Sequence, residues 1–228
     1  MKKKLAEFIK HIGMFRLISS HCYNGMGFLL MYHRIVKNLD ENIFVQPGMY
    51  VLADVFRSQI TFLKENYNIL PLSDFVRRFN GEQSLEGCCA ITFDDGWIDN
   101  YTQAFPVLLE QQVPATIFIA TGFIGTNRLF WPEELIFYLQ KPGVLSSSRS
   151  NPLLNRLLDS IKKKNAAAGE FYDSAIMALK SWDWEEREEL LSELRSKHKS
   201  ISFERHLLNW EEVQKMRKSG LITFGSHT

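Results

Sequence analysis

Cysteine is scarce in this chain, and two other features that would indicate a class of protein are missing. The 228 residues include three cysteines, too few for a disulfide framework, and Cys88 and Cys89 are neighbours that could pair only with strain. Lys and Arg number 27 against 26 Asp and Glu, so no excess of positive charge indicates nucleic-acid binding. No stretch of the sequence is long and apolar enough to span a bilayer. These absences indicate an ordinary globular protein with reduced, buried thiols.

Residues 1–26 are the one segment with any membrane character. Met1-Lys2-Lys3-Lys4 resembles the basic start of a signal peptide, but charged residues interrupt the apolar core that should follow. Apolar residues recur instead at helical spacing up to Leu17, which predicts a basic amphipathic N-terminal helix followed by a linker. We expect this helix to pack on its own domain or, alternatively, to make peripheral contact with a membrane. The predicted location is therefore cytoplasmic or membrane-associated.

Short apolar runs that alternate with helical patterns predict the fold class. Runs of this kind, bounded by glycine and proline, are typical of buried strands. Strands that are apolar throughout and alternate with helices indicate a parallel sheet, and hence an α/β fold. A charge-rich helical stretch at about 141–205 contains no strand pattern, so we interpret it as a helical insertion. The predicted strands are 27–32, 69–72, 88–93, 115–120 and 221–224. The predicted helices include 53–66, 73–79 with Ser73 as its N-cap, 99–112, and 210–219 with Asn209 as its N-cap.

Two adjacent carboxylates, Asp94 and Asp95, end the apolar run at 88–93. Acids at the end of a buried strand are unfavourable unless a positive partner meets them, and either a metal ion or a basic side chain would serve. His33 and His227 follow other predicted strands, and parallel strands bring their carboxyl ends to one edge of a sheet. Asp and His together can bind a divalent metal, although zinc usually takes three protein ligands. The alternatives are a structural Asp-Gly turn and, for His33, a structural histidine.

The motif Thr92-Phe93-Asp94-Asp95-Gly96 resembles the first motif of the polysaccharide deacetylase family, the NodB-homology domain of carbohydrate esterase family 4. Ser226-His227-Thr228 resembles the start of its second motif, which continues with two free positions and another histidine. The resemblance implies that residues 27–228 are the N-terminal part of such a domain, a partial, distorted (β/α) barrel of parallel strands. The segment at 30–35 resembles the first strand of the branch that deacetylates exported poly-N-acetylglucosamine, and 56–72 resembles the segment after it. The segments at 114–118 and 209–220 resemble the family's next strand and the part that leads into the second motif.

This resemblance implies a metal-dependent hydrolase that removes N-acetyl groups from an N-acetylated polysaccharide or glycan precursor. Asp94 would be the general base that takes a proton from the attacking water. Asp95 and His227 would bind a divalent metal, with zinc expected, and the metal would polarise the acetyl carbonyl. The candidates for substrate or supporting contacts are His33, Trp97 and Thr228.

The family's later motifs have no counterpart before the sequence stops at Thr228. We therefore expect a fragment or a truncated gene, with impaired catalysis and an exposed sheet edge that promotes association. The alternative function is a non-catalytic carbohydrate-binding or envelope-assembly protein with a degenerate deacetylase fold. A phosphohydrolase is disfavoured, because such enzymes typically separate their two aspartates by one residue. The sequence predicts a glycan substrate and no specific protein partner.

Overall fold

The computed structural model describes residues 26–38, 48–146, 151–161, 168–198 and 204–227. The chain divides into two compact units. The first comprises residues up to 37, 51–124 and those from 208 on, and is called the sheet unit here. The second comprises 38–50 and 125–207, and is called the helical unit. The predicted N-terminal helix lies outside the described residues, as does the linker that follows it, apart from Met26.

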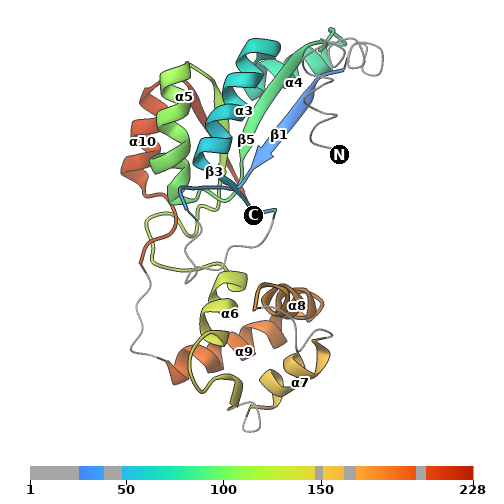
Figure 1. The fold of residues 1–228 in the computed structure, drawn as a ribbon, viewed down its shortest axis with the longest axis vertical. Coiled ribbons are helices and arrows are strands. Elements are labelled where there is room, and N and C mark those ends of the chain that lie inside the picture. The colour runs from blue at the N-terminus through green and yellow to red at the C-terminus, as the bar shows by residue number, and fades with distance from the viewer. Residues whose placement is uncertain (1–25, 39–47, 147–150, 162–167, 199–203, 228) are drawn as a thin grey trace. The chain divides into compact units, whose positions relative to one another are not determined.

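The sheet unit is built on a five-stranded sheet whose pairs are all parallel (Figure 1). The strand order is β1-β5-β6-β7, and β4 also pairs with β5. This arrangement confirms the predicted α/β class with a parallel sheet. The strands are β1 (Phe28–Tyr32), β4 (Asn68–Ile69), β5 (Cys88–Phe93), β6 (Ala115–Ile119) and β7 (Ile222–Ser226).

Strand β5 is buried along its whole length because both of its faces are covered. Its alternate residues Cys89, Ile91 and Phe93 join the main apolar core, which helices α3, α5 and α10 complete. Cys88 and Ala90 point to a smaller cluster that includes Phe75 of helix α4. Helices α3 (Ala53–Asn66), α4 (Leu72–Asn80), α5 (Phe105–Gln111) and α10 (Trp210–Lys218) thus cover the sheet.

The helix boundaries agree with the sequence in part. Asn209 caps α10 as predicted: its side chain accepts from the Glu212 N–H, and the Glu212 carboxylate accepts from the Asn209 N–H, both at 2.8 Å. The predicted Ser73 cap is wrong, because α4 already begins at Leu72 and has Pro71 at its N-cap. The helix predicted at 99–112 is divided into the π-helix η1 (Asn100–Ala104) and α5, whose first turn accommodates Pro106.

Strands β2 (Arg34–Val36) and β3 (Tyr50–Leu52) form a separate two-stranded sheet that the sequence did not predict.

Strand β1 lies at one end of the strand order, and it exposes Leu29 and Met31. The expected association through this edge stays a prediction. Cys88 and Cys89 are free and buried, and burial raises the pKa of the Cys89 thiol to about 12.

The helical unit has an apolar core of its own, which contains Leu135, Leu154, Leu179 and Leu190. Its most prominent polar contact is the pair of hydrogen bonds from Arg195 to the buried carboxylate of Glu134, at 2.7 and 3.1 Å. The helices are α6 (Trp131–Leu139), α7 (Pro152–Ser160), α8 (Ala168–Lys180) and α9 (Trp184–Lys197). The domain boundaries proposed from the sequence, with an insertion at about 141–205, stay a prediction. In the described part of the chain, no helix has both the length and the hydropathy that crossing a bilayer requires.

Candidate active site

The polar residues that follow the strands lie together at one edge of the sheet. His33 follows β1, Asp94 and Asp95 follow β5, and His227 follows β7. The strand ladder continues into these residues, since the Asp94 N–H donates to the Tyr32 carbonyl at 2.9 Å and the His227 N–H donates to the Ile119 carbonyl at 2.8 Å. The sheet therefore brings together side chains that are almost 200 residues apart in the sequence.

Asp94 lies between the two histidines. Its Oδ2 atom is 3.7 Å from Nε2 of His227 and 4.0 Å from Nε2 of His33. His227 Nε2 is also 3.8 Å from Oδ1 of Asp95. All four side chains are partly exposed, between 17 and 33%. They are thus held near one another and still accessible to a substrate or an ion.

The turn at Asp95-Gly96 sets the direction of the two carboxylates. Both residues have positive φ angles, 74° for Asp95 and 80° for Gly96. This region is unfavourable for a residue other than glycine, and such strain is concentrated at functional sites. Hydrogen bonds hold the turn, because the Ala120 N–H donates to the Asp95 carbonyl and the Leu208 N–H donates to the Gly96 carbonyl. A side chain at position 96 would also lie 2.8 Å from Cγ2 of Ile119, so the turn requires glycine.

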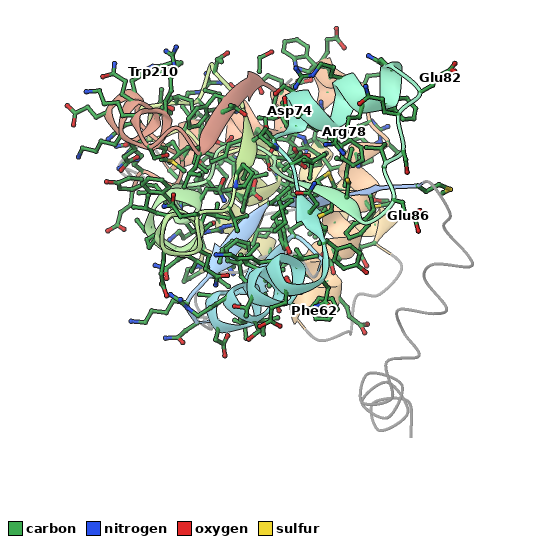
Figure 2. The ribbon with its side chains drawn as sticks, turned by 90° about the horizontal axis from the view of Figure 1, so that it is seen from above. Phe62, Asp74, Arg78, Glu82, Glu86 and Trp210 are labelled. Atoms are coloured by element: carbon green, nitrogen blue, oxygen red, sulfur yellow. The ribbon has the colours of Figure 1, made fainter. Side chains whose placement is uncertain are left out.

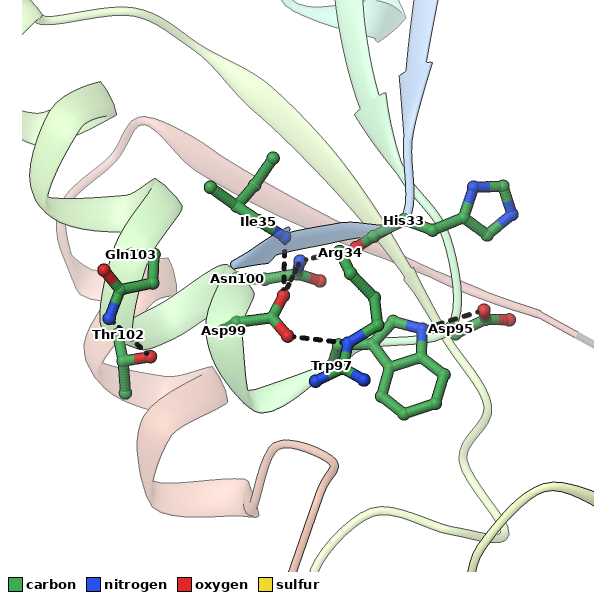
Figure 3. Close-up of polar contacts among 9 residues, drawn as sticks. All are labelled: His33, Arg34, Ile35, Asp95, Trp97, Asp99, Asn100, Thr102 and Gln103. Carbon is green, nitrogen blue, oxygen red and sulfur yellow. Dashed lines mark hydrogen bonds and ion pairs between the residues drawn. The ribbon is translucent and has the colours of Figure 1, made fainter. Parts of the chain in front are cut away.

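Trp97 lies beside Asp95, with its indole nitrogen directed to that carboxylate (Figure 3). Its indole N–H donates to Oδ2 of Asp95 at 3.0 Å, and the residue is only 2% exposed. Because the Trp97 ring is buried, it offers no face to a ligand. Its hydrogen bond to Asp95 is a contact of the supporting kind.

Sequence reasoning missed a buried ion pair next to the site. Arg34 Nε donates to Oδ2 of Asp99 at 2.9 Å, and the other carboxylate oxygen accepts from the Ile35 N–H at 2.8 Å. Burial raises the pKa of Asp99, and the charge of Arg34 and the Ile35 N–H oppose this shift. The Asn100 side chain donates to the His33 carbonyl at 2.8 Å. Only the position of Arg34 directly after His33 could have indicated its place near the site.

The donor atoms of the site are those that a divalent metal takes. Asp95 Oδ1 and His227 Nε2 offer a carboxylate oxygen and an imidazole nitrogen, which suit zinc. Within the described ranges there is no group of three or more His, Cys, Asp or Glu side chains that could hold a metal ion. Two donor atoms of the kinds that zinc binds thus lie 3.8 Å apart, one fewer than the three protein ligands that zinc usually takes. Thr228, the remaining predicted site residue, lies outside the described residues.

Comparison with known proteins gives a consistent result. The family model described as "Polysaccharide deacetylase" matches residues 81–228. The poly-beta-1,6-N-acetyl-D-glucosamine N-deacetylase of Staphylococcus epidermidis is 26% identical over 206 residues, which cover 84% of this chain and 69% of that protein. The protein of the same name from Staphylococcus aureus is 25% identical over 205 residues, again 84% of this chain and 69% of the relative.

Two solved structures are similar to this chain at low sequence identity. The structure of IcaB from Ammonifex degensii aligns with a TM-score of 0.48 and 18% identity, over 89% of this chain and 52% of that one. A de-N-acetylase from Aggregatibacter actinomycetemcomitans aligns with a TM-score of 0.46 and 19% identity, over 89% of this chain and 54% of that one. The chain thus spans about half the length of these two solved proteins.

Proposed function

Since the chain belongs to the polysaccharide deacetylase family, we propose that it carries the general base and two metal ligands of a metal-dependent N-deacetylase. The observation that carries this proposal is the position of His227 Nε2, which is 3.7 Å from Asp94 and 3.8 Å from Asp95. One imidazole nitrogen near two adjacent carboxylates, at the carboxyl ends of parallel strands, suits metal-assisted hydrolysis.

The two carboxylates have different surroundings, and this supports different roles. Asp95 accepts the Trp97 N–H on Oδ2, so its Oδ1 atom is the one directed to His227. We assign Asp95 and His227 as metal ligands. Asp94 Oδ2 faces both histidines, and we assign Asp94 as the base that takes a proton from the attacking water. The bound metal, with zinc as the proposed ion, supplies polarisation of the acetyl carbonyl and charge neutralisation.

His33 is far from Asp94 in the sequence but close to it in the structure, where its Nε2 atom is 4.0 Å from Asp94 Oδ2. An imidazole at this distance can orient the Asp94 carboxylate or hydrogen-bond to a substrate. We propose one of these supporting roles for His33. The reaction would convert water and an N-acetyl group into acetate and a free amine.

The substrate class follows from the names of the relatives. The Staphylococcus proteins are named poly-beta-1,6-N-acetyl-D-glucosamine N-deacetylases, and the alignments cover 84% of this chain. We propose that the substrate is an N-acetylglucosamine polymer or a related glycan. The second candidate function is glycan binding without catalysis, and it is favoured by the lack of a three-ligand cluster among the described residues.

Zinc binding and acetate release together test this proposal. We expect the purified chain to bind Zn²⁺ in calorimetric titrations, and we expect Asp95→Ala and His227→Ala each to weaken binding by about tenfold or more. Acetate released from β-1,6-linked N-acetylglucosamine oligomers should require the metal. Replacing the exposed Arg57 with lysine is the control, since this side chain pairs with Glu110 on the surface. Zinc affinity unchanged by both substitutions would refute the proposed ligands, and zinc binding without acetate release would favour the glycan-binding alternative.

A further inference from the structure

A chain of contacts runs from the buried ion pair to Asp95, through the ring of Trp97. We infer that Trp97, Arg34 and Asp99 are positioning residues that hold the Asp95 carboxylate in the orientation required for metal binding. The inference rests on the proposed function, in which Asp95 is a metal ligand. It assigns this positioning role to three side chains that are not themselves proposed as metal ligands.

The first contact restricts the rotation of the Asp95 carboxylate. The terminal torsion of an aspartate has a broad energy profile, so a carboxylate without fixed partners samples many orientations. The indole N–H of Trp97 is a donor only, and it takes Oδ2 of Asp95 at 3.0 Å. With Oδ2 held in this way, Oδ1 remains directed to His227, 3.8 Å away. The hydrogen bond therefore selects which oxygen can bind a metal.

The second contact restricts the Trp97 ring. The guanidinium of Arg34 lies over the indole, 4.5 Å from its centroid, a favourable cation–π geometry. Arg34 is fixed in turn by its hydrogen bond to Asp99, whose carboxylate is also held by the Ile35 N–H (Figure 3). A lysine could not reproduce this arrangement, because only the planar guanidinium can stack on the ring and donate from Nε in the same plane.

The same group of residues also fixes the other side of the site. Asn100, the neighbour of Asp99, donates to the His33 carbonyl at 2.8 Å. The segment 97–100 thus holds Asp95 through Trp97, and residues 33–35, which follow β1, through Asn100 and Asp99. A buried ion pair is weak evidence for stability, since apolar residues of similar volume are often equally stable. Its alignment with a metal-ligand candidate is better explained by orientation of the site.

Zinc affinity of a Trp97→Phe variant is the first test. Phenylalanine keeps an aromatic ring under Arg34 and removes only the N–H donor. Loss of a residue that orients a metal ligand typically lowers affinity about 10–100-fold, and we expect a decrease in this range for Zn²⁺. Trp210→Phe is the matched control, because Trp210 is 51% exposed on the surface (Figure 2) and should leave the affinity unchanged. We expect Arg34→Lys and Asp99→Asn to weaken zinc binding as well, and Arg57→Lys not to.

The indole N–H resonances provide a test that does not require a metal. The chain has five tryptophans, and the Trp97 peak in a ¹⁵N–¹H spectrum is identified by its loss in Trp97→Phe. If the contacts are as described, this peak shifts in Asp95→Ala and in Asp99→Asn, while the Trp210 peak does not. A residue needed only for folding would give no such selective response.

The outcomes separate this inference from the proposed function. Wild-type protein that fails to bind Zn²⁺ would refute the proposed metal site, and the resonance shifts would still decide whether Trp97 holds Asp95. A Trp97 peak that does not respond to Asp95→Ala would overturn the inference. So would a Trp97→Phe variant that is folded and binds Zn²⁺ as tightly as the wild type.

Discussion

Replacing Gly96 with alanine should destabilise the protein more than the same change at Gly87. Both glycines have positive φ angles, 80° and 66°, so an alanine at either position is strained. The surroundings differ, because a Cβ atom at Gly96 would lie 2.8 Å from Cγ2 of Ile119, and at Gly87 it would meet nothing within 4 Å. The left-handed conformation costs about 1–2 kcal/mol for a residue with a Cβ. Overpacking against Ile119 adds about 1–3 kcal/mol at Gly96 alone.

The expected loss in the free energy of unfolding is therefore about 2–5 kcal/mol for Gly96→Ala and about 1–2 kcal/mol for Gly87→Ala. Urea denaturation followed by near-ultraviolet circular dichroism measures both values, and comparable m-values would show that the denatured states are alike. Gly87→Ala is the control, because it carries the same backbone strain without a steric contact. The difference in the free energy of unfolding between the two variants therefore reports the contact with Ile119. Equal losses at the two positions would refute this reasoning.

Three further predictions concern catalysis, pH and the helical unit. Asp94→Asn should lower the rate of acetate release about 10²–10⁴-fold without changing zinc affinity by a similar factor, as kinetics and calorimetry would show. Burial, and secondarily the charge of Cys89, raise the pKa of Tyr32 to about 12. The unfolded chain therefore loses this proton first, so the free energy of unfolding should fall as the pH rises from about 10 to about 12, and less so in Tyr32→Phe. Glu134→Gln should destabilise the helical unit by about 1–3 kcal/mol in thermal unfolding, because Arg195 loses a buried charged acceptor. Glu193→Gln, in the more exposed pair with Lys197, should change stability by less than about 1 kcal/mol.

A strand was predictable from the sequence where it is long enough and buried enough to give a continuous apolar run. Strand β5 is buried at all six positions because both of its faces are covered, and Thr92 is its only polar residue; its bounds agree with the prediction. Strands β2 and β3 have three residues each, too few for a recognisable pattern. The place of the site was predictable for a related reason, since parallel strands bring their carboxyl ends to one edge. The proximity of His33, Asp94 and His227 follows from this rule.

The supporting contacts were not predictable, because they depend on tertiary structure. Arg34 and Asp99 are 65 residues apart in sequence and share no motif. Trp97 follows an Asp-Gly turn with two positive φ angles, and the sequence alone does not indicate that its ring is buried after this turn. The Ser73 cap failed for a local reason, since the fixed φ angle of Pro71 allows the helix to start directly after it.

The pairing of β6 with β7 has a consequence for how the protein folds. Thr116 and Thr223, whose hydroxyls are 2.7 Å apart across this pair, are 107 residues apart in sequence, and residues 125–207 of the helical unit lie between them in the chain. Closing a loop of this length is entropically unfavourable, and parallel pairing of distant strands forms slowly. His227 reaches the carboxylates only when β7 has paired, so competence to bind zinc should develop late in refolding. A metal-sensitive dye in a stopped-flow experiment could then follow the closing of the sheet directly.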